Sequence, residues 1–277
     1  MRQGETRYLL GGRFYRLAWT AWGDRAAPCM VCVHGLTRNG RDFDVLAEAL
    51  SDRFHVVCPD LPGRGRSEWL AEPSLYQPMS YVQALSHLLA ALGGEVAWLG
   101  TSLGGICGMV TASMQGSPVS RLLLNDVGRF IPRAALARIG DYIGTVPARF
   151  ADLAAVERYL RQVHAPFGRL TDAQWRHMAL HSARALPDGG LAPHYDPAIA
   201  VPILATAPAD QDLSVWWSRV AVPRMVIRGT DSDLLDAATF AAMGQDGART
   251  LEIEGAGHAP ALMDGASIAA VRRFLSA

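Results

Sequence analysis

The feature that most constrains the fold is a series of short apolar runs that alternate with helix-like segments. Six runs recur along the chain: CMVCVHG, FHVVCPD, EVAWLG, RLLLNDVG, RMVIRGTD and TLEIEG. Runs without polar alternation are typical of parallel strands covered on both faces. Between them, residues 42–52 and 80–93 carry apolar side chains at helical spacing, and residues 7–22 resemble a hairpin. The alternation predicts an α/β fold with a mostly parallel, doubly wound sheet and helices on both faces.

One long segment departs from this alternation. Residues 129–200 contain no strand-like run, and their helix-like pieces are interrupted by prolines. Because the segment lies between two predicted strands of one sheet, we interpret it as an insertion and not as a separate domain. We therefore expect a helical lid at 129–200, inserted after the sixth strand into a core formed by 1–128 and 201–277.

Composition excludes several classes of function. The formal net charge is zero, which argues against a nucleic acid bound through its phosphates. There is no lysine, so Schiff-base enzymes and P-loop proteins are excluded. A membrane span needs about eighteen consecutive apolar residues, and no stretch approaches that length. The first residues show no signal-peptide pattern. We therefore expect no membrane contact. Few cysteines in apolar contexts indicate free thiols and a cytoplasmic protein: Cys29, Cys32, Cys58 and Cys107.

A candidate nucleophile follows the run EVAWL. In GTSLG, Ser102 lies between Gly100 and Gly104, after a predicted strand and before a helix of small residues. A tight strand-to-helix turn lifts such a serine hydroxyl above the sheet edge and crowds the residues two before and two after it. Glycine at both places indicates a turn of this kind, so Ser102 is the predicted nucleophile.

A serine hydroxyl is a poor nucleophile without an adjacent base. Of the eight histidines, His258 alone follows the last predicted strand in a glycine-rich loop, and it is the predicted base. A buried carboxylate must orient this base, and both Asp126 and Asp233 end predicted strands in the right chain order. We favour Asp126. A carboxylate buried beside the turn is costly unless it is paired, and pairing with the base would supply that partner. Asp233 is explained without catalysis as a solvated loop residue.

The motifs in combination resemble the α/β-hydrolase superfamily over nearly the whole chain. Its oxyanion loop is resembled by VCVHGLTRNGRDFD, and the turn after its fourth strand by VVCPDLPGRGRS. Its nucleophile elbow is resembled by GTSLGG, and its histidine loop by EGAGHAPAL. The resemblance implies an α/β-hydrolase fold and an oxyanion hole formed by the N–H groups of Leu36 and Leu103. NDVG and PDGGL further resemble a branch that contains acetamidomethylene-succinate hydrolase, which takes its acid from the sixth strand. SDLL instead resembles the seventh-strand acid of many esterases and carbon–carbon hydrolases.

Other polar residues near these motifs are interpreted as structural. The resemblance implies that His34, which precedes the glycine of the oxyanion loop, supports that loop and takes no part in the reaction. Asp60 and Arg64 lie in the turn DLPGRGRS, which we interpret as a bend and not as a charged site. We expect Ser67 to cap the helix after this turn.

These residues predict a serine hydrolase that works through an acyl-enzyme. Serine at the elbow argues against haloalkane dehalogenases and epoxide hydrolases, which have aspartate there. A carboxylic ester with a small or medium acyl group is the favoured substrate. The alternatives are a carbon–carbon bond or an amide of a catabolic pathway, or a slow-turnover ligand receptor built on this fold. We expect a small-molecule substrate as partner and neither a cofactor nor a metal, and no sequence feature specifies an oligomeric state.

Overall fold

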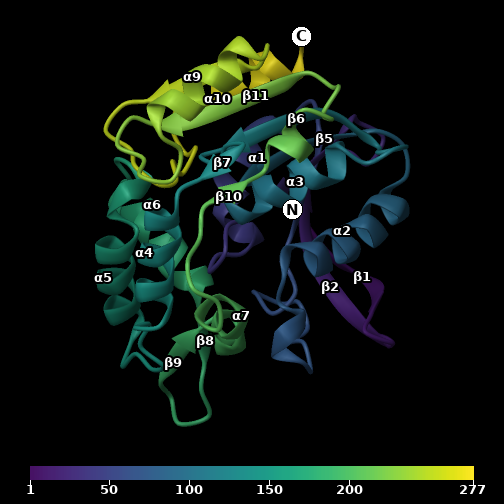
Figure 1. Ribbon diagram of the computed structural model, residues 1–277. Helices are drawn as coiled ribbons and strands as arrows, with labels where there is room; N and C mark the ends of the chain where they lie inside the picture. The colour runs from purple at the N-terminus through teal and green to yellow at the C-terminus, as the bar shows by residue number, and fades with distance from the viewer.

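An eight-stranded sheet forms the centre of the computed structural model, which describes residues 1–277 (Figure 1). The strand order is β1–β2–β4–β3–β5–β6–β11–β12. β1 and β2 pair antiparallel, as do β2 and β4, and every other neighbouring pair is parallel. The strands are β1 (Arg2–Leu10), β2 (Arg13–Trp22), β3 (Cys29–Val33), β4 (His55–Pro59), β5 (Val96–Thr101), β6 (Val119–Asn125), β11 (Arg224–Gly229) and β12 (Arg249–Ile253). The predicted mostly parallel sheet and N-terminal hairpin are confirmed.

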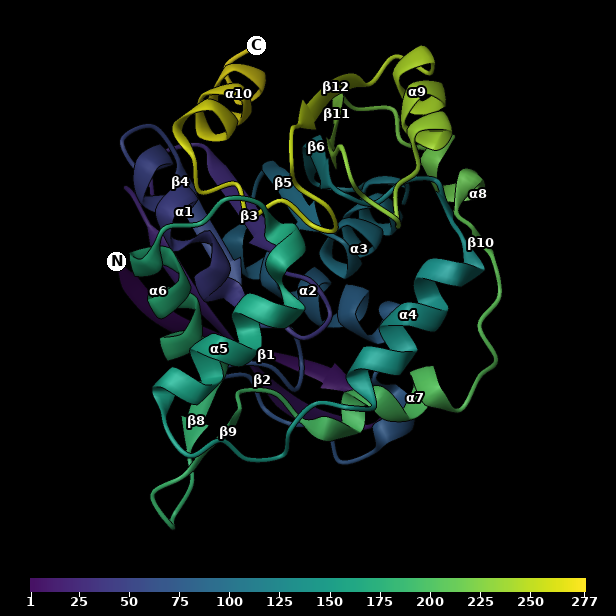
Figure 2. The same ribbon diagram turned by 90° about the vertical axis from the view of Figure 1, so that its left-hand side faces the viewer.

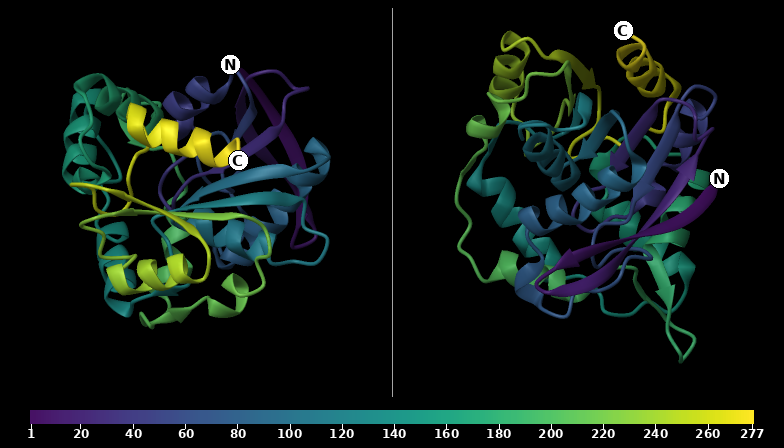
Figure 3. Two further views of the ribbon diagram at one scale, coloured as in Figure 1. Left: turned by 90° about the horizontal axis from the view of Figure 1, so that it is seen from above. Right: turned by 90° about the vertical axis from the view of Figure 1, so that its right-hand side faces the viewer.

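Helices cover both faces of this sheet, as predicted. On one face lie α1 (Asp44–Leu50) and α10 (Gly265–Leu275), and on the other α2 (Pro78–Leu92), α3 (Leu103–Ala112) and α9 (Ala237–Gln245). The left view in Figure 3 shows α10 and α9 on opposite sides of the strands. Along β3, Met30 and Cys32 belong to one hydrophobic core and Val31 and Val33 to the other. The apolar runs lack polar alternation because both faces of each central strand are buried.

The chain between β6 and β11 leaves the sheet and forms most of the remaining helices. These are α4 (Arg133–Ile143), α5 (Leu153–Val163), α6 (Asp172–Ser182), α7 (Val201–Leu204) and α8 (Ser214–Trp217), with short 3₁₀ turns η3 (Ala165–Phe167) and η4 (Pro197–Ala200). α5 packs against α6. Figure 1 shows both with α4 on the left-hand side of the molecule, and Figure 2 faces that side. None of the helices combines the length and apolar character that a bilayer span requires.

One detail of this segment differs from the sequence-based expectation. We expected no strand-like run in 129–200, but β7 (Phe130–Ile131), β8 (Ala183–Ala185) and β9 (Leu191–Pro193) lie there. β8 pairs antiparallel with β9, and β7 pairs antiparallel with β10 (Gln211–Asp212). Strands of two or three residues are too short to give an apolar run. The boundary between lid and core at residue 201 stays a prediction, and the main sheet resumes at Arg224.

The turn after β4 is held together by buried hydrogen bonds. The Asp60 carboxylate accepts the N–H groups of Gly40 at 2.8 Å and Arg66 at 2.9 Å. The Ser67 hydroxyl accepts the Ala18 N–H at 2.8 Å and donates to the Asp60 carbonyl. Ser67 therefore ties the turn to β2 and does not cap a helix, so that expectation is wrong. Its hydroxyl is used within the turn before the next helical element begins at Pro73.

Candidate active site

Ser102 occupies a strained turn between β5 and α3. Its φ of 51° and ψ of −115° lie outside the regions that most side chains adopt. The Ser102 N–H donates to the Asn125 carbonyl at 2.9 Å, and its carbonyl accepts the N–H groups of Gly105 and Ile106. A Cβ on Gly100 or Gly104 would overlap backbone atoms of the neighbouring segments. The turn predicted from GTSLG is therefore present, and the surrounding backbone holds the serine in its strained conformation.

Ser102, His258 and Asp126 form a continuous chain of hydrogen bonds. His258 Nε2 lies 3.0 Å from Ser102 Oγ, and His258 Nδ1 lies 2.7 Å from Asp126 Oδ2. Because an ionised carboxylate only accepts, Nδ1 carries the proton and Nε2 is free to accept the proton of the serine hydroxyl. This is the geometry of a nucleophile, a base and an orienting acid.

Asp126 is fully buried and receives three hydrogen bonds. Besides His258, the Gly229 N–H donates to Oδ1 at 3.0 Å and the Ser232 hydroxyl donates to Oδ2 at 2.6 Å. Charge-assisted bonds of this kind offset the cost of burying a carboxylate. Asp126 therefore has the hydrogen-bond partners that a buried carboxylate needs, and His258 is one of them.

Asp233, the alternative acid, lies elsewhere. Both of its carboxylate oxygens bind the guanidinium of Arg138, which comes from α4. The two side chains are 50% and 45% exposed, so this is a surface ion pair. The structure brings Asp126, and not Asp233, to His258.

Of the two residues predicted for the oxyanion hole, Leu36 lines the same cavity as Ser102, and Leu103 directly follows Ser102 in the chain. Leu36 N–H donates to no backbone carbonyl, and Leu103 begins α3, so its N–H has no partner within the helix. The partial positive charge at the start of α3 also favours a negative oxygen there. The Leu36 carbonyl accepts a hydrogen bond at 2.9 Å from Nε of Arg64, which is fully buried. Arg64 therefore fixes the orientation of the oxyanion loop.

His34 supports the same loop, as the resemblance implied. Its Nε2 accepts the Leu61 N–H at 2.9 Å, and its Nδ1 donates to the Gly35 carbonyl at 2.7 Å. Burial lowers the pKa of His34 to about 3, so the imidazole is neutral and both ring nitrogens are used. His34 has no free nitrogen for a reaction.

Two polar residues of this region had not been predicted. Ser232 holds Asp126, and the Asn125 amide donates to the Pro260 carbonyl at 2.8 Å in the histidine loop. Arg64, which we interpreted as structural, holds the Leu36 carbonyl. Asn125 and Ser232 stand directly before the two candidate aspartates in NDVG and SDLL. A polar residue beside a buried acid is the signal that could have indicated them.

A cavity of about 510 Å³ opens over Ser102 and His258. Its core side is formed by the oxyanion loop and the histidine loop, and the opposite wall comes from the chain between β6 and β11. That wall includes Arg138, Ile139 and Tyr142 of α4, Gln162 and Val163 of α5, His164, Phe167 of η3 and Met178 of α6. The volume is large enough for a small or medium ester.

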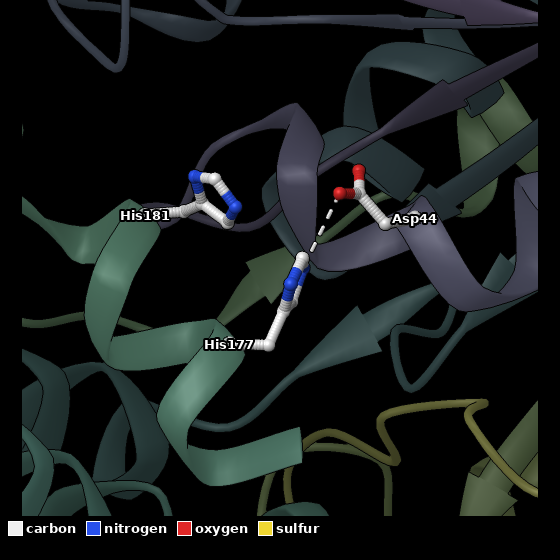
Figure 4. Close-up of side chains that lie close together, drawn as sticks. All are labelled: Asp44, His177 and His181. Atoms are coloured by element: carbon white, nitrogen blue, oxygen red, sulfur yellow. Dashed lines mark ion pairs between the residues drawn. The ribbon is translucent and has the colours of Figure 1, made fainter. Parts of the chain in front are cut away.

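One side-chain cluster outside this cavity has metal-ligand chemistry. Asp44 of α1 and His177 and His181 of α6 lie close together, with His177 Nε2 at 3.3 Å from Asp44 Oδ2 (Figure 4). However, Arg41 binds both carboxylate oxygens of Asp44, with Nε at 2.8 Å from each. A cation would have to displace this guanidinium. In the structure the cluster links α6 to α1, and none of its three residues lines the cavity.

Comparison with known proteins identifies the family. Residues 30–271 match the model of the alpha/beta hydrolase family. The chain is an alpha/beta hydrolase. This hydrolase is 43% identical to the 3-hydroxybutyrate-oligomer hydrolase of Cupriavidus necator, over 99% of its own length and 98% of that protein. It is 28% identical to the 2-(acetamidomethylene)succinate hydrolase of Mesorhizobium japonicum, over 78% of this chain and 75% of that one.

A solved structure has the same fold over the whole chain. The putative hydrolase from Rickettsia typhi superposes with a TM-score of 0.92 at 30% identity, covering 100% of this alpha/beta hydrolase and 99% of the other chain. The predicted superfamily and fold are thereby confirmed, and the protein is a hydrolase.

Proposed function

We propose that this alpha/beta hydrolase is a serine hydrolase that cleaves carboxylic esters, with short oligoesters of a hydroxy acid such as 3-hydroxybutyrate as substrates. The observation that carries the reaction is the hydrogen-bonded chain from Ser102 through His258 to Asp126 at the cavity. The substrate class is supported by 43% identity, over nearly the full length of both chains, to a 3-hydroxybutyrate-oligomer hydrolase.

The proposed reaction begins when Ser102 Oγ attacks the ester carbonyl and its proton passes to His258 Nε2. The carbonyl oxygen becomes negative and accepts hydrogen bonds from the N–H groups of Leu36 and Leu103. Collapse of the tetrahedral intermediate breaks the ester bond, and His258 gives its proton to the leaving alcohol. The acyl group then remains on Ser102. Asp126 orients His258 and stabilises its protonated form.

Water completes the cycle. It loses a proton to His258 Nε2 while its oxygen attacks the acyl-enzyme carbonyl, and the same oxyanion hole holds the second intermediate. Its collapse returns the proton to Ser102 and releases the carboxylic acid. No cofactor enters either step, and a small-molecule substrate is the partner that we propose.

The lid at residues 129–200 is part of the proposal. Support comes from the cavity wall, which α4, η3 and α6 form opposite Ser102. Residues of the inserted segment would then select the substrate, while the core supplies the reacting groups. A cytoplasmic location is also proposed, supported by four cysteines that are all free thiols.

A second candidate is an amide or carbon–carbon hydrolase of a catabolic pathway. It is supported by the 28% identity to a 2-(acetamidomethylene)succinate hydrolase. The position of Asp126 directly after β6, where that branch takes its acid, agrees with it. The receptor alternative predicts binding or a single burst of product instead of sustained turnover.

The test is hydrolysis of p-nitrophenyl esters from acetyl to decanoyl, and of 3-hydroxybutyrate dimer and trimer. Wild type and Ser102→Ala are compared, with the exposed Ser276→Ala as a matched control. We expect steady turnover that falls at least about 10³-fold in Ser102→Ala and is unchanged in Ser276→Ala. Turnover that survives Ser102→Ala would refute the mechanism. A burst without turnover would favour the receptor, and inactivity on all esters would favour the amide or carbon–carbon reading.

A further inference from the structure

One of the three histidines that line the cavity, His164, has no hydrogen-bond partner for its side chain. His164 ends α5, is 9% exposed and shares the cavity with Ser102 and His258. His34, Asp126 and His258 are hydrogen-bonded through their side chains, whereas neither ring nitrogen of His164 has a partner within the protein. A buried polar group left unpaired is destabilising, so such a group facing a cavity indicates a ligand.

The position of His164 relative to His258 is fixed by the backbone. The Gly257 N–H donates to the Pro166 carbonyl at 2.7 Å, and the Ala261 N–H donates to the Phe167 carbonyl at 3.1 Å. These two bonds join η3 to the loop that carries His258. The His164 ring stacks on Phe167 with centroids 4.5 Å apart. The imidazole is therefore held beside the reacting groups by the same contacts that hold their loop.

The chemistry of His164 selects the group that it can bind. Burial, together with the neighbouring charge of Arg38, lowers its pKa well below the ordinary value, so the ring is neutral. A neutral imidazole offers one N–H donor and one acceptor nitrogen. A hydroxyl group also donates and accepts, so it can bind either ring nitrogen. A carboxylate has no donor, so it cannot bind the acceptor nitrogen.

The other polar groups of the cavity wall are already engaged or solvated. The Arg38 guanidinium binds Asp42 through Nε at 2.7 Å and Ser182 through Nη1 at 2.9 Å. The hydroxyls of Thr37 and Tyr142 bind each other at 3.0 Å. Arg138 is paired on the surface and Gln162 is exposed. His164 is thus the buried polar group of this wall that is free to meet a substrate.

We propose that His164 binds a hydroxyl group on the acyl part of the substrate, so that the enzyme selects hydroxyacyl esters over the corresponding acyl esters. This inference rests on the proposed ester hydrolysis at Ser102 and adds the residue that selects the substrate. An ester without the hydroxyl would leave the imidazole unpaired in the complex, which is how a site discriminates against an analogue that lacks a polar group.

The experiment compares ethyl 3-hydroxybutyrate with ethyl butyrate, followed by acid release. Four proteins are measured: wild type, His164→Leu, His164→Gln and the remote control His87→Leu. In wild type we expect kcat/KM to favour the hydroxy ester by on the order of tenfold to a hundredfold. His164→Leu should bring this ratio close to one by lowering kcat/KM for the hydroxy ester more than for the butyrate ester. His164→Gln, which keeps a donor and an acceptor, should retain part of the preference, and His87→Leu all of it.

Other outcomes separate this inference from the proposed function. If wild type hydrolyses both esters without preference, or if His164→Leu keeps the preference, His164 does not bind the hydroxyl. An equal loss of both activities in His164→Leu and His164→Gln, with unchanged thermal unfolding, would show a different role and also overturn the inference. If wild type hydrolyses neither these esters nor the p-nitrophenyl series, the proposed ester hydrolysis itself fails.

Discussion

At the scale of single residues, the candidate site depends on a carboxylate that water does not reach. Asp126 is fully buried, and every hydrogen bond to it comes from a group that the fold fixes: His258, the Gly229 N–H and the Ser232 hydroxyl. Asp233 is half exposed and binds Arg138 instead. Two aspartates that look equivalent in the sequence therefore have different environments, and only one of them can orient the base.

This difference predicts the effect of removing each charge. Asp126→Asn should lower kcat for ester hydrolysis by about 10³- to 10⁴-fold, because an amide cannot stabilise the protonated histidine. Asp233→Asn should leave most of the activity and change the free energy of unfolding by at most about 1 kcal/mol, since it breaks an exposed ion pair. Steady-state kinetics and urea unfolding of both variants check this. The reverse ranking of activities would exclude Asp126 as the acid.

At the scale of elements, η3 and the histidine loop hold each other in place. Two backbone hydrogen bonds join residues 166–167 to Gly257 and Ala261. A Cβ on Gly257 would lie 2.9 Å from Cβ of Pro166, a separation that requires one of the two segments to move. The absence of a side chain at Gly257 therefore permits the close approach that fixes His258 and His164 together.

Gly257→Ala should push η3 and the histidine loop apart. We expect a loss of about 1–3 kcal/mol in the free energy of unfolding, because a proline ring cannot yield easily. A lower kcat should accompany it, because His258 shifts relative to Ser102. The matched control is Gly265→Ala at the start of α10, where a Cβ meets nothing within 4 Å. That variant should be as stable as wild type or slightly more so. Equal stability and activity of the two variants would contradict the proposed contact.

At the scale of the whole molecule, folding places several histidines where they are kept neutral. Burial lowers the pKa of His34 to about 3, and burial with the nearby charge of Arg41 lowers that of His181 to about 4. In the unfolded chain, histidine titrates near pH 6.5. The unfolded state therefore binds more protons than the folded state between these values, and the contribution of each histidine to stability is lost as the pH falls.

This linkage predicts that acid destabilises the protein more steeply than its carboxylates alone would. The histidines should lower the free energy of unfolding as the pH falls from 6.5 to about 4. The slope of this free energy against pH reports how many more protons the unfolded state binds than the folded state. In His181→Gln that number should be smaller by up to one. Some groups have the opposite effect on stability in acid, such as Asp60, whose pKa is raised by burial. Their contribution is the same in wild type and in His181→Gln, so it cancels when the two slopes are compared. Urea unfolding at several pH values measures both slopes. Identical slopes would mean that His181 is not held neutral by the fold.

The sequence by itself determined the sheet, the elbow and the base. Apolar runs without alternation specify buried parallel strands, and GTSLG after such a run specifies the turn at Ser102, because both are local patterns of hydrophobicity and backbone conformation. His258 followed from its place after the last predicted strand. These features depend on neighbours in the chain, so one sequence is enough to indicate them.

The tertiary structure decided between the acids and revealed His164. The hydrogen bonds of His258 reach 132 residues along the chain to Asp126 and 156 to Ser102, and no local pattern encodes such contacts. Ser232 points inward to Asp126 while Asp233 points outward, a difference set by how the loop after β11 meets the end of β6. His164 lies at the end of one helix among several in the inserted segment. It faces the cavity because η3 docks on the histidine loop, and only three-dimensional contact between distant segments can produce that arrangement.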